Sequence, residues 1–329
     1  MRLSVEERWS TLAEAAARDL REHPEWPTTL YRELATLADG EERRVVIATD
    51  SGKAVGLMAF QRERGGLNWT PVTQWVIPDF VGLGEPAIQE EMLRRLPFRS
   101  KIAWWRASAP VPEVGGRIWH VDTESTYGTL LSADFEAHWK STDCARTIRR
   151  AERRSGALPL TINAPGAAEW VIRNCERKWR ADASAELPRT QHRLLAARHL
   201  EQLGKFFTLT LSSDGDLAAG QNILLHRREL VCIDTYRAPQ FDHLGVGNAL
   251  LARVYRWGRE QGYTAIDIGG GFSYKDDWSP PRGTKSYVQI SPLLDRVRAR
   301  YGGRVLSACR ALVRRARTLM STRSEKLSG

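Results

Sequence analysis

Residues 235–263, TYRAPQFDHLGVGNALLARVYRWGREQGY, decide the fold in the second half of this chain of 329 residues. A β-rich run ends at the start of the stretch, and the rest of it has the apolar spacing of a helix. Gly245 and Gly247 stand in the first turn of that helix, so its backbone N–H groups and the positive end of its dipole face outward. Such a helix start suits a pyrophosphate or carboxylate. The same glycines also suit close packing of the helix on its strand, and the spacing alone favours neither reading.

Strands flank this helix on both sides. Three β-rich runs between residues 205 and 238 precede it, separated by turn signals at 214–215 and 227–228. The short run TAIDIGG, residues 264–270, follows it. The pattern predicts an antiparallel meander, a helix and one more strand. Two helices are predicted upstream: residues 132–156, capped at Ser132 or Asp134, and residues 167–182.

The first half of the chain is a rough echo of the second. It has a helical pattern over residues 5–18, a hairpin signal over residues 43–63 and a second helical pattern over residues 85–96, followed by an apolar strand. This order indicates an α+β class, and the echo indicates two similar domains packed together. The predicted parts are residues 1–130, residues 131–293, and a basic amphipathic helix and tail over residues 294–329 that packs back on the first domain.

Three segments in this order resemble a known fold: FEAHWKSTDCARTIRRAERRSGA (135–157), the stretch 235–263, and TAIDIGGGFSYKDDWSP (264–280). They are similar to the GCN5-related N-acetyltransferase (GNAT) superfamily. Within it they resemble the FemX-like and CelD-like branch, whose BioF2-like acetyltransferase domain sits in a double-GNAT architecture. The resemblance covers about residues 130–290. It implies two tandem GNAT-like domains, mixed sheets flanked by helices, and transfer of an acyl group to an amine in cell-surface, polysaccharide or specialised-metabolite biosynthesis.

The resemblance also implies where an acyl donor binds. Acetyl-CoA or another acyl-CoA is the default donor, and the residues predicted to hold it are Leu244, Gly245, Val246, Gly247 and Asn248. The family usually has Gln or Arg three residues before the first of these glycines, where this chain has Asp242. A carboxylate beside an anionic ligand is unfavourable. Aminoacyl-tRNA, the donor in the FemX branch, is therefore the alternative.

Lys275 and Tyr274 occupy the aromatic-lysine pair of the FemX-like ending. If the role of the lysine in that family applies here, Lys275 is the cation that stabilises the developing oxyanion or a donor phosphate, with Tyr274 beside it. The competing reading is a surface pair between Lys275 and Asp276 or Asp277.

Asp234 and Tyr236 lie on one face of the last strand of the meander. A carboxylate in an apolar strand suits a general base in a polar cleft, and Tyr236 suits a proton donor to the leaving group. A charge on the solvent side of the sheet is the equally weighted alternative for Asp234. Asp267 is predicted to order the glycine-rich turn by accepting backbone N–H bonds.

Net charge is +10, and it is concentrated in two segments. Residues 140–154 carry six basic residues against two acids, and residues 295–329 carry ten against two. Helical spacing places Arg146, Arg149, Arg150 and Arg153 on one face, suited to an anionic substrate or an RNA backbone, or else solvated. An inactive module that binds RNA or an anionic membrane surface through these two segments is a third functional reading.

Composition narrows the remaining classes of function. The four cysteines show no paired spacing, which favours reduced thiols and predicts neither a disulfide framework nor a metal site. The charged start MRLSVEERWS predicts no secretory signal, and no apolar run is long enough to span a bilayer. We therefore expect a cytoplasmic or membrane-peripheral enzyme. Its expected partners are a small-molecule or glycan amine acceptor and, for the alternative donor, tRNA, but not DNA.

Overall fold

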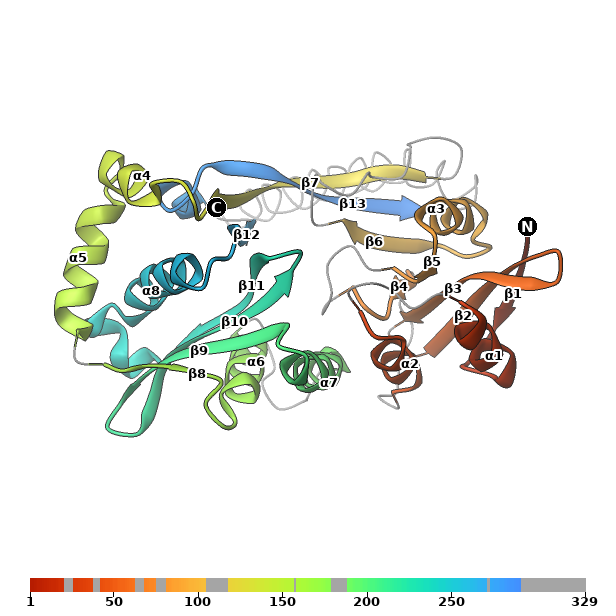
Figure 1. The fold of residues 1–329 in the computed structure, drawn as a ribbon, viewed down its shortest axis with the longest axis horizontal. Coiled ribbons are helices and arrows are strands. Elements are labelled where there is room, and N and C mark those ends of the chain that lie inside the picture. Colours follow the sequence, from red (N-terminus) through yellow and green to blue (C-terminus); the bar gives the residue numbers. More distant parts are fainter. Residues whose placement is uncertain are drawn as a thin grey trace, which may run out of the picture.

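The computed structural model describes residues 1–20, 26–37, 42–62, 68–74, 81–104, 118–156, 158–178, 188–270 and 273–290. Two β-sheets with helices packed against them organise this part of the chain, which confirms the predicted α+β class (Figure 1). The basic segment 294–329, predicted as a helix and tail, lies outside the described residues. The domain boundary near residue 130 stays a prediction.

The first sheet is antiparallel and is built around a hairpin. In the order β1-β2-β3-β4, with β5 also on β3, its strands are β1 (Arg2–Glu6), β2 (Glu42–Asp50), β3 (Lys53–Arg62), β4 (Thr70–Pro71) and β5 (Leu83–Gly84). Ser51 and Gly52 turn the chain with φ of 49° and 80°, the left-handed pair that matches the twist of two antiparallel strands. The hairpin predicted over residues 43–63 is therefore confirmed. The helices beside this sheet are α1 (Thr11–Asp19), α2 (Thr28–Thr36) and α3 (Pro86–Arg95).

The second sheet joins strands from both halves of the chain. Its order is β6-β13-β7-β12-β11-β10-β9-β8. Its strands are β6 (Ser100–Trp104), β7 (Ile118–Leu130), β8 (Leu160–Ile162), β9 (Phe206–Ser213), β10 (Asp216–His226), β11 (Glu229–Arg237), β12 (Ala265–Gly270) and β13 (Pro281–Ile290). Strands β7 and β13 run together from one side of the molecule to the other, where β13 also pairs with β6 (Figure 1).

Helices cover both faces of the β8–β11 part of this sheet (Figure 1). They are α4 (Phe135–Ser141), α5 (Cys144–Ser155), α6 (Ala167–Lys178), α7 (Pro188–Gln202) and α8 (Val246–Glu260). Successive residues of β11 point to opposite faces, so Leu230 packs in the core beneath α5 and α8, while Val231 packs with α6 and α7. The meander, the helix over 246–260 and the strand over 265–270 are all as predicted.

Two predicted helices have different bounds from those expected. The helix predicted from residue 5 begins at Thr11, where Ser10 caps it, and the residues before it form β1, paired with β2. The helix predicted over 132–156 is divided into α4 and α5 by Thr142, whose backbone is extended. Its start is as predicted, since Asp134 caps α4 by accepting from the Ala137 N–H at 3.1 Å.

The two halves share a continuous core. Leu30 and Leu34 of α2 belong to the same buried cluster as Leu194 and Leu200 of α7. At the edge of this contact, Glu33 pairs with His199 at 2.8 Å. One buried cluster therefore spans both halves, because apolar side chains from α2 and α7 bury one another.

Candidate functional site

Strands β11 and β12 start side by side and then separate. Their parallel pairing covers residues 229–231 and 265–267, and no further pair joins these two described strands. Beyond it, β11 continues against β10 and β12 pairs β7 at Gly270. A register shift in the β10–β11 ladder leaves Ile233 as an extra residue, a bulge that bends β11 as it leaves β12. From Cys232 onward, the edge of β11 that faces β12 has no ladder partner among the described strands.

Lys275 reaches this separation from the short 3-10 helix η2 (Ser273–Asp277). Its Nζ donates to the carbonyl oxygens of Ile268 at 2.7 Å and Gly270 at 2.8 Å, at the end of β12. A Cβ on Gly269 would lie 3.5 Å from this Nζ and 4.0 Å from the carbonyl oxygen of Cys232. The ammonium group therefore lies at the end of β12, beside the turn at Gly269, which comes close to Cys232 of β11.

The turn that receives Lys275 is ordered by Asp267. Its Oδ1 accepts from the N–H of Gly269 at 2.7 Å, as the sequence predicted. Gly269 has φ 75°, a left-handed conformation that favours glycine. Asp276 and Asp277 are exposed, whereas the Lys275 ammonium group donates to the two carbonyl oxygens at the end of β12. These two hydrogen bonds favour a place for Lys275 in the turn over a surface ion pair.

Helix α4 and Thr142 hold η2 in place. Their side chains reach three successive backbone carbonyl oxygens: His138 Nε2 to Asp276 at 3.0 Å, Thr142 Oγ1 to Asp277 at 3.0 Å, and Trp139 Nε1 to Trp278 at 3.1 Å. Next along the chain, the Ser279 hydroxyl lies 2.5 Å from the buried Tyr255 hydroxyl of α8. These contacts fix the segment on both sides of Lys275, and they explain why the chain leaves helical conformation at Thr142.

Helix α8 begins with an open N-terminus. Gly245, its N-cap, has φ 69°, and no side chain caps the helix. A Cβ on Gly245 would lie 3.1 Å from the Cβ of Ala151, so this glycine serves close packing on α5. A Cβ on Gly247 would meet Arg237 at 3.5 Å, an ordinary contact, so this glycine leaves the first turn uncovered. The N–H groups of the first two residues, Val246 and Gly247, precede the first bonded turn and suit an anion, whereas the Asn248 N–H donates to the Gly245 carbonyl oxygen at 3.1 Å.

Asp242 lies just before this helix start and has its own counter-ion. Arg237 Nε is 3.2 Å from Asp242 Oδ1, and both side chains are exposed. Partial burial raises the pKa of the nearby Tyr274 hydroxyl, and the positive charge of Arg237 lowers it by less. Because Arg237 balances Asp242, the carboxylate does not make the start of α8 negative.

Helix α5 presents its arginines to solvent. Arg146, Arg149, Arg150 and Arg153 are all exposed, while Ile148 and Ala151 pack inward. Arg146 pairs with Asp143 at 3.1 Å. Arg154, one turn from this group, donates to the carbonyl oxygen of His243 at 3.4 Å, beside the start of α8. Within the described part of the chain, Arg149, Arg150 and Arg153 have no carboxylate at ion-pair distance.

Asp234 is buried on the opposite face of β11, toward α6 and α7, so a place on the solvent side is excluded. Only 2% of its side chain is exposed, and its Oδ1 lies 3.0 Å from Arg193 of α7. The same guanidinium nitrogen lies 2.8 Å from Glu176 of α6. Burial alone would lower the pKa of Arg193, but the carboxylates of Asp234 and Glu176 raise it by more. Tyr236, on the same face, packs edge-on against Trp170 with ring centroids 5.1 Å apart.

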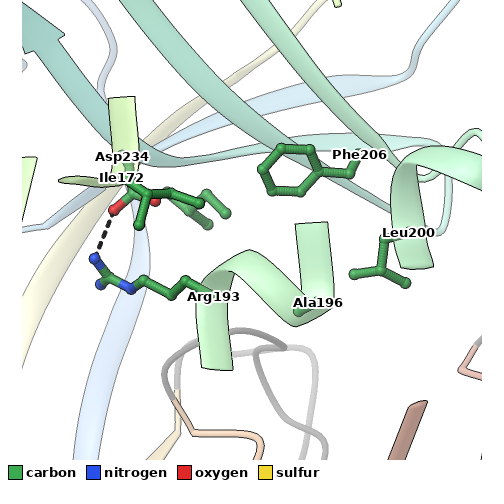
Figure 2. Close-up of a pocket in the computed structure, with 7 residues that line it drawn as sticks. Ile172, Arg193, Ala196, Leu200, Phe206 and Asp234 are labelled. Atoms are coloured by element: carbon green, nitrogen blue, oxygen red, sulfur yellow. Dashed lines mark ion pairs between the residues drawn. The ribbon is translucent and has the colours of Figure 1, made fainter. Parts of the chain in front are cut away.

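A small pocket adjoins this ion pair (Figure 2). Asp234 and Arg193 line its polar end, and Ile172, Ala196, Leu200 and Phe206 are among its apolar walls. Figure 2 shows these side chains converging from α6, α7 and the sheet. The pocket thus combines one buried charged end with an otherwise apolar lining.

Comparison with known protein families finds a match for the central part of the chain. Residues 141–276 match the family model described as acetyltransferase (GNAT) domain. Over these residues the chain is similar to a GNAT domain. The resemblance inferred from the sequence is confirmed over this range, which includes α5, the helix start at α8 and Lys275. No curated protein matches the chain.

Solved structures similar to the whole chain are distant in sequence. FemX is 10% identical with a TM-score of 0.49, covering 87% of this chain and 97% of its own. A tandem GNAT protein from the clavulanic acid biosynthesis pathway is 12% identical with a TM-score of 0.47, covering 88% and 98%. The C-terminal domain of a putative lysylphosphatidylglycerol synthetase from Agrobacterium fabrum is also 12% identical, with a TM-score of 0.47, covering 89% and 94%. Similarity at this level says nothing of ligand or reaction.

The structure places the predicted residues in two groups, one on each face of β11. Lys275 and the 244–248 helix start lie on the side of α8, with Tyr274 near Arg237. Asp234 and Tyr236 lie on the side of α6 and α7. The bulge at Ile233 lies at the point where β11 leaves β12, between the two groups.

Three charged residues at these sites were not predicted. Arg193 lies on α7, a helix that the sequence pattern did not indicate, and Glu176 is an ordinary polar position of α6. Arg237 could have been found, because it is the cation nearest in sequence to Asp242. No group of three His, Cys, Asp or Glu side chains in the described ranges is placed to bind a metal ion. Likewise, none of the helices described here is long and apolar enough to cross a membrane.

Proposed function

We propose that the GNAT domain transfers an acyl group from an acyl-CoA to an amine, in cell-surface, polysaccharide or specialised-metabolite biosynthesis. The observation that carries this is the position of the Lys275 ammonium group at the end of β12, just past the point where β11 and β12 separate. A fixed cation there suits the negative charge that develops on an acyl oxygen during transfer. The contacts from α4 and Tyr255 support the role, because stabilisation of this kind requires a charge that is already in place.

The start of α8 is the proposed site of the donor's phosphates. The uncovered first turn at Gly247 fits an anion, and Leu244, Gly245, Val246 and Asn248 supply the surrounding backbone. Asp242 would place a negative charge next to the phosphates of the donor, but its ion pair with Arg237 neutralises that charge. A bound acyl-CoA supplies an activated acyl group on sulfur.

The reaction moves two protons. The amine nitrogen forms a bond to the acyl carbon as the carbon–sulfur bond breaks. Tyr274 is the proposed donor of the proton that the sulfur gains, because it adjoins Lys275 in η2 and a phenol is protonated near neutral pH. The proton that the nitrogen loses passes to solvent, since Asp234 is buried on the opposite face of β11 and is paired with Arg193. Tyr236 lies on the same face as Asp234, so we assign neither residue a role in transfer.

Aminoacyl-tRNA is the second candidate donor, and one observation favours it. Arg149, Arg150 and Arg153 form an exposed cationic face on α5, the helix that packs against the start of α8. An RNA backbone would satisfy several of these charges at once, whereas one CoA molecule carries few phosphates.

The donor is tested by binding before activity. Purified protein is washed in high salt, its 260/280 nm absorbance ratio is recorded, and CoA and tRNA are then titrated in separate calorimetric experiments. We expect CoA to bind and tRNA to show at most salt-sensitive association. If tRNA binds and CoA does not, aminoacyl-tRNA replaces acyl-CoA as the proposed donor. If neither binds, an inactive module on RNA or an anionic membrane is favoured. A thiol-release assay with acetyl-CoA and a panel of amines then tests transfer.

A further inference from the structure

The side chain of Arg237 lies beside the first turn of α8. Arg237 is the last residue of β11, and a Cβ on Gly247 would lie 3.5 Å from its Cδ. A Cβ on Gly245 would instead meet Ala151 of α5. The two glycines therefore have different neighbours, and the aliphatic stem of Arg237 is the neighbour of the uncovered turn at Gly247.

The guanidinium group of Arg237 makes few contacts. Its Nε lies 3.2 Å from Asp242 Oδ1, and 58% and 47% of the two side chains are exposed. A guanidinium has five N–H donors, four of them on its two terminal nitrogens. Within the described part of the chain, neither terminal nitrogen of Arg237 donates a hydrogen bond. An exposed pair of this kind contributes little to stability, so the contact with Asp242 does not by itself account for the arginine.

A second arginine approaches the same short 3-10 helix, η1 (Pro239–Leu244). Arg154 of α5 donates to the carbonyl oxygen of His243 at 3.4 Å, one residue after Asp242. Arg237 from β11 and Arg154 from α5 thus bring two guanidinium groups to adjacent residues of η1, just before the start of α8. Guanidinium groups and backbone N–H groups that lie close together suit the oxygen atoms of a phosphate.

Arg237 is also close to the segment proposed to act in transfer. Its positive charge lowers the pKa of the Tyr274 hydroxyl, by less than burial raises it. Tyr274 precedes Lys275 in η2, and the Lys275 ammonium group lies at the end of β12. One arginine is therefore near both the proposed phosphate site and the proposed oxyanion cation.

We infer that Arg237 binds a phosphate group of the acyl donor, and that Asp242 competes with this phosphate for the guanidinium group. The terminal nitrogens of an arginine form a planar pair of donors that matches two phosphate oxygens. Asp242 engages Nε and leaves that pair accessible. Once a phosphate also draws on Arg237, the carboxylate is no longer fully neutralised and lowers the affinity. That the phosphate belongs to an acyl-CoA rests on the proposed function.

Calorimetric titration of the full-length protein with CoA, dephospho-CoA and inorganic pyrophosphate tests the role of Arg237. We expect Arg237→Gln to weaken each probe by about tenfold or more, because all three contain a pyrophosphate group. Arg237→Lys should recover part of the loss, since it keeps the charge without the paired donors. Exposed Arg198→Gln on α7 is the control for the loss of one positive charge and should leave all three affinities unchanged.

The melting temperature of each variant is recorded, so that binding is compared between folded proteins. If folded Arg237→Gln and the unaltered protein bind dephospho-CoA equally, the inference is overturned, because this probe keeps the pyrophosphate group and lacks the third phosphate of CoA.

Asp242→Asn tests the competition. The amide keeps the size of the side chain but removes its charge, so CoA should bind about two- to fivefold more tightly, the range for breaking an exposed ion pair. Exposed Asp216→Asn, at the start of β10, is the control for the loss of one carboxylate and should leave CoA binding unchanged. If Asp242→Asn binds CoA no more tightly than Asp216→Asn does, Asp242 does not compete with the phosphate.

The same titrations separate this inference from the proposed function. If CoA binds the unaltered protein and Arg237→Gln equally, acyl-CoA stands as the donor and the role of Arg237 is overturned. If inorganic pyrophosphate binds through Arg237 but CoA does not bind, the acyl-CoA donor fails and phosphate binding by Arg237 stands. If none of the three probes binds the unaltered protein, both are overturned.

Discussion

The ammonium group of Lys275 donates to two carbonyl oxygens, so this side chain stabilises the turn after β12 whether or not it acts in chemistry. Hydrogen bonds from a charged donor contribute about 1.5–3 kcal/mol net. A loss of activity after truncation to alanine therefore mixes two effects, and a substitution that keeps a donor is the better test.

We expect Lys275→Gln to lower turnover by at least a hundredfold while lowering the free energy of unfolding by about 1–3 kcal/mol. The amide still donates one hydrogen bond to the turn, but it lacks the positive charge that would stabilise the acyl oxygen. Turnover is measured per folded molecule, with Lys275→Arg as the control that keeps the charge. Turnover of folded Lys275→Gln equal to that of the unaltered protein would make the lysine structural only.

Buried thiols give the second residue-scale prediction. Burial raises the pKa of Cys175 from 9.0 to about 11, with Asp234 adding to the effect, and raises the pKa of Cys144 to about 12. Because the folded state keeps these protons more tightly than the unfolded state, their contribution is full below pH 9 and is lost as pH rises through 11 to 12. We expect stability to fall above about pH 9, by up to about 1.4 kcal/mol per pH unit for each group.

Denaturant unfolding between pH 7 and 11 checks this slope. Cys175→Ala should make the decline shallower above pH 9 even if it lowers stability at pH 7. An unaltered slope in this variant would mean that other groups cause the alkaline loss.

At the scale of elements, the two glycines at the start of α8 have different structural roles. Gly245 combines φ 69° with a contact at 3.1 Å on α5, whereas a Cβ on Gly247 would make only an ordinary contact, at 3.5 Å, with Arg237. We expect Gly245→Ala to destabilise the protein by about 1–3 kcal/mol, the range for a residue held in an unfavourable backbone region. Gly247→Val should instead weaken CoA binding at least tenfold with a smaller loss of stability, because its side chain covers the open N–H groups.

Calorimetry with CoA and thermal unfolding of both variants measure the two effects side by side. The reverse pattern would mean that donor phosphates do not bind at the start of α8.

How much of these elements could be predicted depends on where their partners lie. The hairpin at Ser51-Gly52 and the Asp267 turn were predictable, because each is decided by residues next to one another. The break at Thr142 was not, since its hydroxyl bonds to Asp277, far along the chain. Helix α7 was missed because it is buried on two sides, by β9 and by α2, which removes a one-sided apolar stripe. The Asp234–Arg193–Glu176 set depends on three separate elements and leaves no local pattern.

On the scale of the whole molecule, the shared core couples the two halves. Leu30 of α2 is 1% exposed and belongs to the cluster that includes α7 and β9. Leu93 of α3 is equally buried, but its cluster lies within the first 102 residues. Truncating either leucine to alanine would leave a cavity of similar size. Only the cavity at Leu30 would adjoin the second half of the chain, so the two leucines form a matched pair.

We expect Leu30→Ala and Leu93→Ala each to lower the free energy of unfolding by about 2–5 kcal/mol, the usual range for a buried leucine. Only Leu30→Ala should also increase amide hydrogen exchange in α7 and β9, because its cavity opens toward these elements. Exposed Leu12→Ala is the control for both, with 50% of the residue accessible. Hydrogen exchange confined to α2 in that variant would show that the halves unfold independently.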